Sequence, residues 1–152
     1  MAGNVIARKI QEDLKTAVKA QDKPRVSALR MVLSALRNAE LEEREELSDE
    51  KELAVVASYA RRIKESIEEF RKAEREDLVA KENAELAIVL FYLPEQMSDE
   101  DIRREAARVI ADIAATTPRD TGRVMGEMMK RFKGKVDGAA VNRIVSELLG
   151  KA

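Results

Sequence analysis

The chain has 152 residues and a formal net charge of −1, and it contains no cysteine, histidine or tryptophan. These absences exclude thiol nucleophiles, catalytic histidines and the usual zinc ligands. The length suffices for a hydrophobic core that needs neither disulfides nor a metal.

Membrane insertion and export are also disfavoured. The longest apolar run, residues 86–93, is far shorter than the ~20 residues that a membrane-spanning helix needs. The amino terminus lacks the basic and then apolar segments of a secretory signal. We therefore predict a cytoplasmic protein.

The near-zero net charge conceals a pattern along the chain. Residues 1–37 hold eight basic and three acidic side chains, residues 38–101 hold nine and twenty, and residues 102–152 hold eleven and six. A polyanion is expected to meet the two ends of the sequence and to avoid its middle. The alternative is that these charges only solvate long helix faces.

The first half of the sequence predicts a pair of helices. Apolar residues recur every three or four positions from Ile6 to Val18, and residues 22–24 break the pattern. Pro24 suits the first turn of a second helix, whose apolar stripe runs to Leu36 and includes Leu41 if the helix continues. Because the connection is short, we expect an antiparallel hairpin.

Ser48 is the expected N-cap of a third helix, with acidic residues in its first turn. The acidic residues 40–52 are interpreted as a solvated helix end and connection. Apolar periodicity continues to Leu93 with an interruption near residues 75–77, so residues 48–93 form either one bent helix or two.

Pro94 predicts a domain boundary, because proline removes a backbone donor and disfavours helical geometry at the preceding residue. Ser98 caps the next predicted helix, Thr117 and Pro118 begin another, and Asp137 caps the last after Gly134 in a left-handed conformation. The sequence thus predicts an all-α fold with two helical lobes: a larger amino-terminal domain, residues 1–93, and a small three-helix domain, residues 94–152.

No catalytic residue, cofactor site or metal site is predicted. Gly134 and Lys135 are followed by valine rather than by the Ser or Thr of a phosphate-binding loop, and no strand precedes them. Carboxylate pairs at helical spacing are frequent, but nothing in the sequence places one of them in the apolar pocket that acid–base catalysis requires.

A basic segment is the stronger candidate. Residues 119–135 hold six basic side chains against Asp120 and Glu127. Phosphate groups could bind there, and the candidate nucleic-acid contacts are Arg119, Arg123, Lys130, Arg131, Lys133 and Lys135. On the same helix Val124, Met128 and Phe132 form a core stripe, and Gly122 and Gly126 would allow a partner helix to approach closely.

Several ordered motifs resemble the YqeY family. They are the run from Glu76 to Ile102 with its Y-L-P-x-Q junction, the V-M-G helix, the K-G-x-x-D-G-x-x-V-N turn, and an upstream helix from Ala28 to Glu40. The same module is similar to the carboxy-terminal tail of the B subunit of the tRNA-dependent glutamyl/aspartyl-tRNA amidotransferase.

The resemblance implies two helical lobes and a role that faces tRNA. It also implies that the label of carbon–nitrogen ligase with glutamine as amide donor belongs to the larger enzyme, since this chain lacks room for its catalytic part. We therefore expect a non-catalytic module that binds tRNA or another structured RNA. Two alternatives stay open: an adaptor that offers its acidic amino-terminal lobe to a translation-related protein, and an amidotransferase-related activity together with partner subunits.

Overall fold

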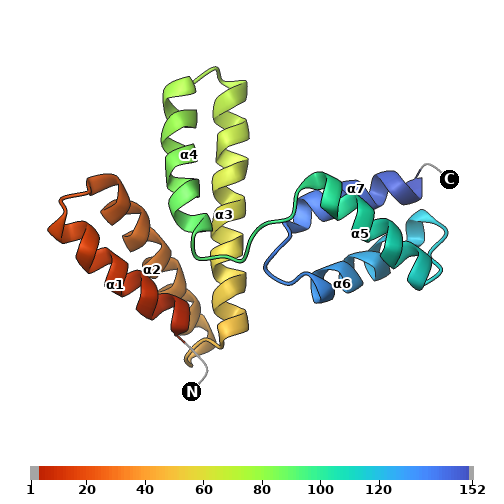
Figure 1. Ribbon diagram of the computed structural model, residues 1–152, viewed down its shortest axis with the longest axis horizontal. Coiled ribbons are helices and arrows are strands. Elements are labelled where there is room, and N and C mark those ends of the chain that lie inside the picture. Colours follow the sequence, from red (N-terminus) through yellow and green to blue (C-terminus); the bar gives the residue numbers. More distant parts are fainter. Residues whose placement is uncertain (1–3, 151–152) are drawn as a thin grey trace. The chain divides into compact units, whose positions relative to one another are not determined.

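The computed structural model describes residues 4–150, and its regular structure is helical throughout (Figure 1). No β-strand occurs in this range, which confirms the predicted all-α fold class. The α-helices are α1 (Val5–Lys19), α2 (Lys23–Glu43), α3 (Asp49–Lys72), α4 (Glu76–Leu90), α5 (Asp99–Asp112), α6 (Thr121–Arg131) and α7 (Gly138–Gly150), and a short 3₁₀ helix, η1 (Pro118–Asp120), precedes α6.

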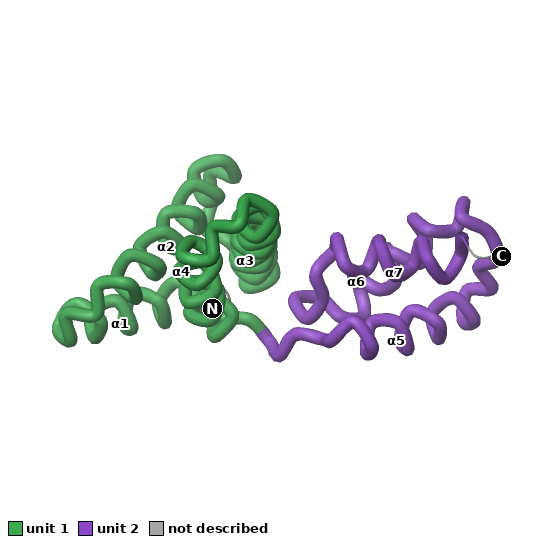
Figure 2. The backbone as a smooth tube through the Cα atoms, turned by 90° about the horizontal axis from the view of Figure 1, so that it is seen from above, with its two compact units in different colours: residues 1–93 green, residues 94–152 purple. Residues whose placement is uncertain are grey.

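The backbone groups into two compact units, residues 1–93 and residues 94–152, coloured green and purple in Figure 2. We call them unit 1 and unit 2. Each has its own cluster of buried apolar side chains. That each unit folds as an independent domain stays a prediction.

Unit 1 consists of two helical hairpins, α1 with α2 and α3 with α4 (Figure 1). The side chain of Asp22 accepts a hydrogen bond from the amide of Arg25 at 3.3 Å and so caps α2, and Pro24 lies in the first turn, as predicted. Contacts of α2 with α3 and α4 join the hairpins around a core that includes Ile10, Leu29, Val32, Leu36, Val56, Ala60 and Val89.

Residues 48–93 form two helices rather than one. The hydroxyl of Ser48 caps α3 by accepting a hydrogen bond from the amide of Lys51 at 3.3 Å. After Lys72 the chain turns through Glu74, whose φ of 58° is incompatible with a continuing right-handed helix. The interruption in the apolar pattern is therefore a tight connection to α4.

Two apolar residues that the sequence predicts in the apolar stripes of helices are exposed. Val18 is 50% and Leu41 is 71% solvent-accessible. Successive residues of an α-helix point about 100° apart, so Val18 cannot share the buried position of Ala17, and Leu41 lies well away from the direction of Leu36.

The acidic stretch is not wholly solvated, contrary to its interpretation as a solvated connection. Leu47 and Glu52 are only 2% and 1% exposed. The Glu52 carboxylate accepts hydrogen bonds from the backbone amides of Ile6 at 3.2 Å and Ala7 at 3.0 Å. These amides belong to the first turn of α1, where no intrahelical acceptor exists, so a side chain of α3 caps α1.

Unit 2 packs α5, α6 and α7 around Ile102, Ala106, Val109, Val124, Met128, Val141, Ile144 and Val145. Ser98 caps α5 through the amide of Asp101 at 3.1 Å, as predicted. Asp137 accepts a hydrogen bond from the amide of Ala139 at 3.2 Å at the start of α7. The expected helix start at Thr117 is the 3₁₀ helix η1, and α6 follows it.

The predicted role of Gly122 and Gly126 is wrong. A Cβ atom at either position would have no neighbouring atom within 4 Å, so no partner helix approaches there. Both glycines lie on the exposed side of α6, opposite the buried Val124 and Met128.

Candidate nucleic-acid interface

The six basic residues singled out from the sequence all belong to unit 2 and are all exposed. We call them the basic cluster: Arg119 on η1, Arg123, Lys130 and Arg131 on α6, and Lys133 and Lys135 in the turn before α7. Their side chains are excluded from the core because Val124, Met128 and Val136 occupy the buried positions of the same segment.

Two members of the cluster are held by neighbouring acidic residues. The Arg123 guanidinium lies 3.0 Å from a carboxylate oxygen of Asp120 and donates a hydrogen bond to the carbonyl of Ile113 at 3.1 Å. Arg131 contacts Glu127 at 2.9 Å and Asp112 at 3.0 Å. Both arginines thus help to join α6 to neighbouring segments of unit 2.

The electrostatics of this region follow from these contacts. Backbone amides of Thr116 and Thr117 donate to Asp120 and, with Arg123 as a smaller contribution, lower the pKa of its carboxyl group. Hydrogen bonds to Glu127 and Asp112 raise the pKa of Arg131. Exposed ion pairs contribute little net stability, so a phosphate can compete for either guanidinium.

Three members of the cluster, Arg119, Lys130 and Lys135, have no ion pair within the described part of the chain. Lys133 takes part in a side-chain or electrostatic interaction and is not counted with them. By contrast, the four other arginines of unit 2 each face a carboxylate: Arg103 faces Glu147, Arg104 faces Asp101, Arg108 faces Glu105 and Arg143 faces Asp99. Positive charge without an ion-pair partner is therefore concentrated on the segment from η1 to the turn before α7.

The turn that carries Lys133 and Lys135 is fixed by contacts that the sequence reasoning missed. Gly134 has a φ of 76°, the predicted left-handed conformation. The Gln96 side-chain amide donates hydrogen bonds to the carbonyls of Gly134 at 2.7 Å and Pro94 at 2.8 Å, and the amide of Met97 donates to the carbonyl of Lys135 at 2.8 Å. The Y-L-P-x-Q and K-G-x-x-D-G motifs thus contact one another in the folded chain. In the sequence, the presence of both motifs was the signal that could have indicated this contact.

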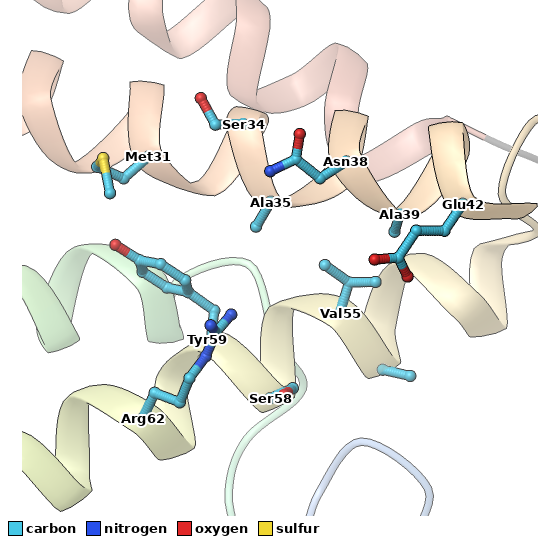
Figure 3. A pocket seen from close by; sticks show the side chains of 11 residues that line it. Met31, Ser34, Ala35, Asn38, Ala39, Glu42, Val55, Ser58, Tyr59 and Arg62 are labelled. Carbon is cyan, nitrogen blue, oxygen red and sulfur yellow. The ribbon is translucent and has the colours of Figure 1, made fainter.

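Unit 1 has grooves on its surface. The groove between α2 and α3 has a volume of about 540 Å³, with Met31 and Tyr59 towards one end and Glu42 towards the other (Figure 3). The Tyr59 hydroxyl donates a hydrogen bond to Glu85 at 2.7 Å, and the Arg62 guanidinium lies over the Tyr59 ring. No His, Cys, Asp and Glu side chains converge as a metal site within residues 4–150.

None of the helices in residues 4–150 combines the length and the apolar character that crossing a bilayer requires. The buried carboxylate of Glu52 is satisfied by two backbone amides, and its role in this geometry is to cap a helix. The described residues form an all-helical protein, and its unit 2 carries the basic cluster on its surface.

The family of this protein follows from comparison with known sequences. The family model described as Yqey-like protein matches residues 7–149, nearly the whole chain. The chain belongs to the YqeY family, as its motifs predicted.

Several similar curated proteins come from fungi and share the name Altered inheritance of mitochondria protein 41, mitochondrial. The protein from Pyrenophora tritici-repentis is 31% identical over 97% of this chain and 82% of its own length. Those from Kluyveromyces lactis and Candida glabrata are 33% and 30% identical, over 84% and 92% of this chain and 67% and 75% of their own lengths.

These names contradict the predicted cytoplasmic location, because the relatives are called mitochondrial proteins. The prediction depended on the lack of an apolar export signal. Mitochondrial targeting segments are amphipathic and arginine-rich rather than apolar, so that criterion does not detect them.

Proposed function

We propose that this YqeY-family protein is a non-catalytic module that binds tRNA or another structured RNA through the basic cluster of unit 2. The observation that carries the proposal is the concentration of Arg119, Lys130 and Lys135, without ion pairs in the described residues, on a segment where Arg123 and Arg131 add further guanidinium groups. Phosphate contacts of this kind position a protein on a nucleic acid without reading its sequence.

Recognition by shape and backbone suits this surface better than base stacking. Unit 2 contains one aromatic residue, Phe132, and it is partly buried against the core. Structured RNA presents phosphates and 2′-hydroxyl groups across a shallow groove, where lysines and arginines at the end of a helix can reach them. A turn held by Gln96 would keep Lys135 in place for such a contact.

The proposal assigns separate tasks to the two predicted domains. Residues 94–152 would bind RNA, and residues 1–93 would serve another interaction. We propose that the RNA partner is a mitochondrial one, and the names of the relatives support this. A carbon–nitrogen ligase activity with glutamine as amide donor would require partner subunits. Ammonia release from glutamine by the purified chain alone would count against a non-catalytic module.

A second candidate is an adaptor for a translation-related protein. The exposed glutamates favour it, namely Glu42, Glu43, Glu45 and Glu46, although Glu43 and Glu45 share Lys51 as a partner at 2.8 and 3.7 Å. A protein that binds a basic partner and shows no affinity for RNA at low salt would favour the adaptor over the RNA-binding module.

Charge reversal tests the proposed function. The variant R119E/K130E/K135E should lose RNA binding, measured by fluorescence anisotropy with labelled tRNA, while its circular dichroism spectrum stays unchanged. The matched control is R61E/K72E/K81E, which changes the net charge equally at exposed positions of α3 and α4. Equal loss of binding in the two variants would show that net charge, and not the basic cluster, attracts RNA.

A further inference from the structure

The hairpin of α1 and α2 (Figure 1) has a hollow in its surface at the start of α2. The hollow has a volume of about 570 Å³, and its lining includes Val18 of α1 and Lys23, Val26, Arg30 and Met31 of α2. Two of these apolar side chains, Val18 and Met31, are 50% and 53% exposed. The hollow therefore offers apolar surface that the rest of unit 1 leaves open to solvent.

The charged side chains that line this hollow are basic. Lys23 and Arg30 belong to the lining, and none of the described acidic residues does. Neither Lys23 nor Arg30 has an ion pair within the described part of the chain, whereas the neighbouring Arg25 lies 3.4 Å from a carboxylate oxygen of Asp22. The hollow thus carries positive charge that unit 1 does not neutralise.

Arg37 continues this positive charge along α2. Lys23, Arg30 and Arg37 recur every seven residues and are all exposed, and Arg37 likewise lacks an ion pair among residues 4–150. Because seven residues make almost two turns of an α-helix, the row of side chains turns by only about 20° at each step. We call these three residues the α2 basic row, and it extends over about 21 Å of helix.

Acidic side chains are scarce beside the α2 basic row. Residues 23–39 contain no Asp or Glu, and the first carboxylate after the row is that of Glu40. On α1, Asp13 is held by a lysine of its own helix at 3.0 Å, and Glu12 lies roughly 120° around the helix from Val18. An anionic partner that lies along the row is therefore attracted over most of its length.

The apolar surface of the hollow selects among anionic partners. RNA offers phosphates and planar bases, and bases stack on aromatic or guanidinium groups rather than on Val18 and Met31. Apolar side chains that enter a bilayer must project from the surface, whereas these two line a hollow. A helix that lies along α2 repeats its side chains with the same seven-residue period, so its carboxylates can face the row while its apolar side chains enter the hollow.

We propose that the α1–α2 hairpin binds an acidic amphipathic helix of a partner protein, with its carboxylates opposite the α2 basic row and an apolar side chain in the hollow beside Val18 and Met31. All residues of this site belong to unit 1, whereas the basic cluster belongs to unit 2. The two sites also differ in chemistry, because a docking surface for a helix needs apolar contact and a phosphate site does not.

The test uses a labelled synthetic helix of about three heptads with leucine at positions a and d and glutamate at e and g, which repels its own copies. Fluorescence anisotropy should show that it binds the full chain, and that a peptide with lysine in place of each glutamate does not. K23E/R30E should raise the dissociation constant of the acidic peptide by about tenfold or more. R61E/K81E makes the same change in net charge at exposed positions of α3 and α4, and it should leave the constant within about threefold of the wild type.

The apolar contact needs its own variant, because charge alone could attract the peptide. Met31→Ser should raise the dissociation constant about fivefold, whereas Met129→Ser, at an exposed position of α6, should not change it. No binding of the acidic peptide at up to about 1 mM, or equal effects of K23E/R30E and R61E/K81E, overturns the proposal. If K23E/R30E weakens the binding of labelled tRNA and leaves peptide binding intact, the row contacts RNA and the proposal is likewise overturned.

Discussion

Gln96 donates a side-chain hydrogen bond to the carbonyl oxygen of Gly134 at 2.7 Å, across 38 positions of the sequence. The bond joins the segment before α5 to the turn between α6 and α7. Lys133 and Lys135 flank Gly134, so the geometry of the basic turn depends on a residue that carries no charge itself.

Replacing Gln96 with alanine should loosen this turn. The variant loses two donor contacts to partly buried carbonyls, and we expect unit 2 to lose about 1–3 kcal/mol of stability. Hydrogen exchange of the α6 and α7 amides is the appropriate measurement, because it reports on unit 2 separately. Gln11→Ala, at an exposed position of α1, is the matched control, and equal exchange rates in the two variants would refute the role of Gln96.

Glu52→Gln should destabilise the start of α1. The carboxylate accepts from the amides of both Ile6 and Ala7, whereas a carboxamide has one oxygen to accept with and presents a donor to the other amide. We expect a loss of about 1–3 kcal/mol in urea unfolding, with faster exchange of the α1 amides. Glu46→Gln, which neutralises an exposed glutamate nearby, should change neither quantity.

Tyr92→Phe should have an effect that depends on pH. The Tyr92 hydroxyl donates to Asp13 at 2.5 Å, and this bond is the largest cause of the lowered pKa of the Asp13 carboxyl group. A carboxyl group whose pKa is lower in the folded state stabilises the fold above its unfolded pKa, and the contribution is lost as pH falls through the folded pKa.

The difference in unfolding free energy between wild type and Tyr92→Phe should therefore be full at neutral pH, about 1–2 kcal/mol, and should shrink once the pH falls below ~4. At alkaline pH the group that titrates is the hydroxyl of Tyr92. Burial and Asp13 raise the pKa of Tyr92 in the folded state, so the stability that this group contributes is lost as the pH rises, and this loss occurs in the wild type alone. A difference in unfolding free energy that stays constant from pH 3 to pH 7, a range that spans the reference pKa of a carboxyl group, would contradict this account.

Local sequence signals predicted much of the helical framework because they act over a few residues. Ser48 and Ser98 cap helices through amides three positions away, and Gly134 has the expected left-handed conformation. Pro24 likewise marks the first turn of α2. Each of these features is satisfied within one turn of the chain, so it can be read without knowledge of the tertiary fold.

Features that join distant segments could not be predicted in the same way. Glu52 occurs in a run of acidic residues, and its burial follows only from the position of α1. Arg131 contacts Asp112, nineteen positions away, so the basic cluster has fewer uncompensated charges than its composition indicates. The exposure of Leu41 likewise depends on which side of α2 contacts the rest of unit 1.

The most direct test of the central claim is a titration of the wild-type protein with tRNA and with an unrelated structured RNA at several salt concentrations. If the basic cluster engages about four phosphates, affinity should fall roughly 50- to 150-fold between 50 and 200 mM salt. R119E/K130E/K135E should show no binding at any of these salt concentrations, whereas R61E/K72E/K81E should keep the salt dependence of the wild type. The lowest salt concentration of that range is 50 mM. If neither RNA binds measurably at that concentration, the result contradicts the claim that unit 2 presents a surface for RNA.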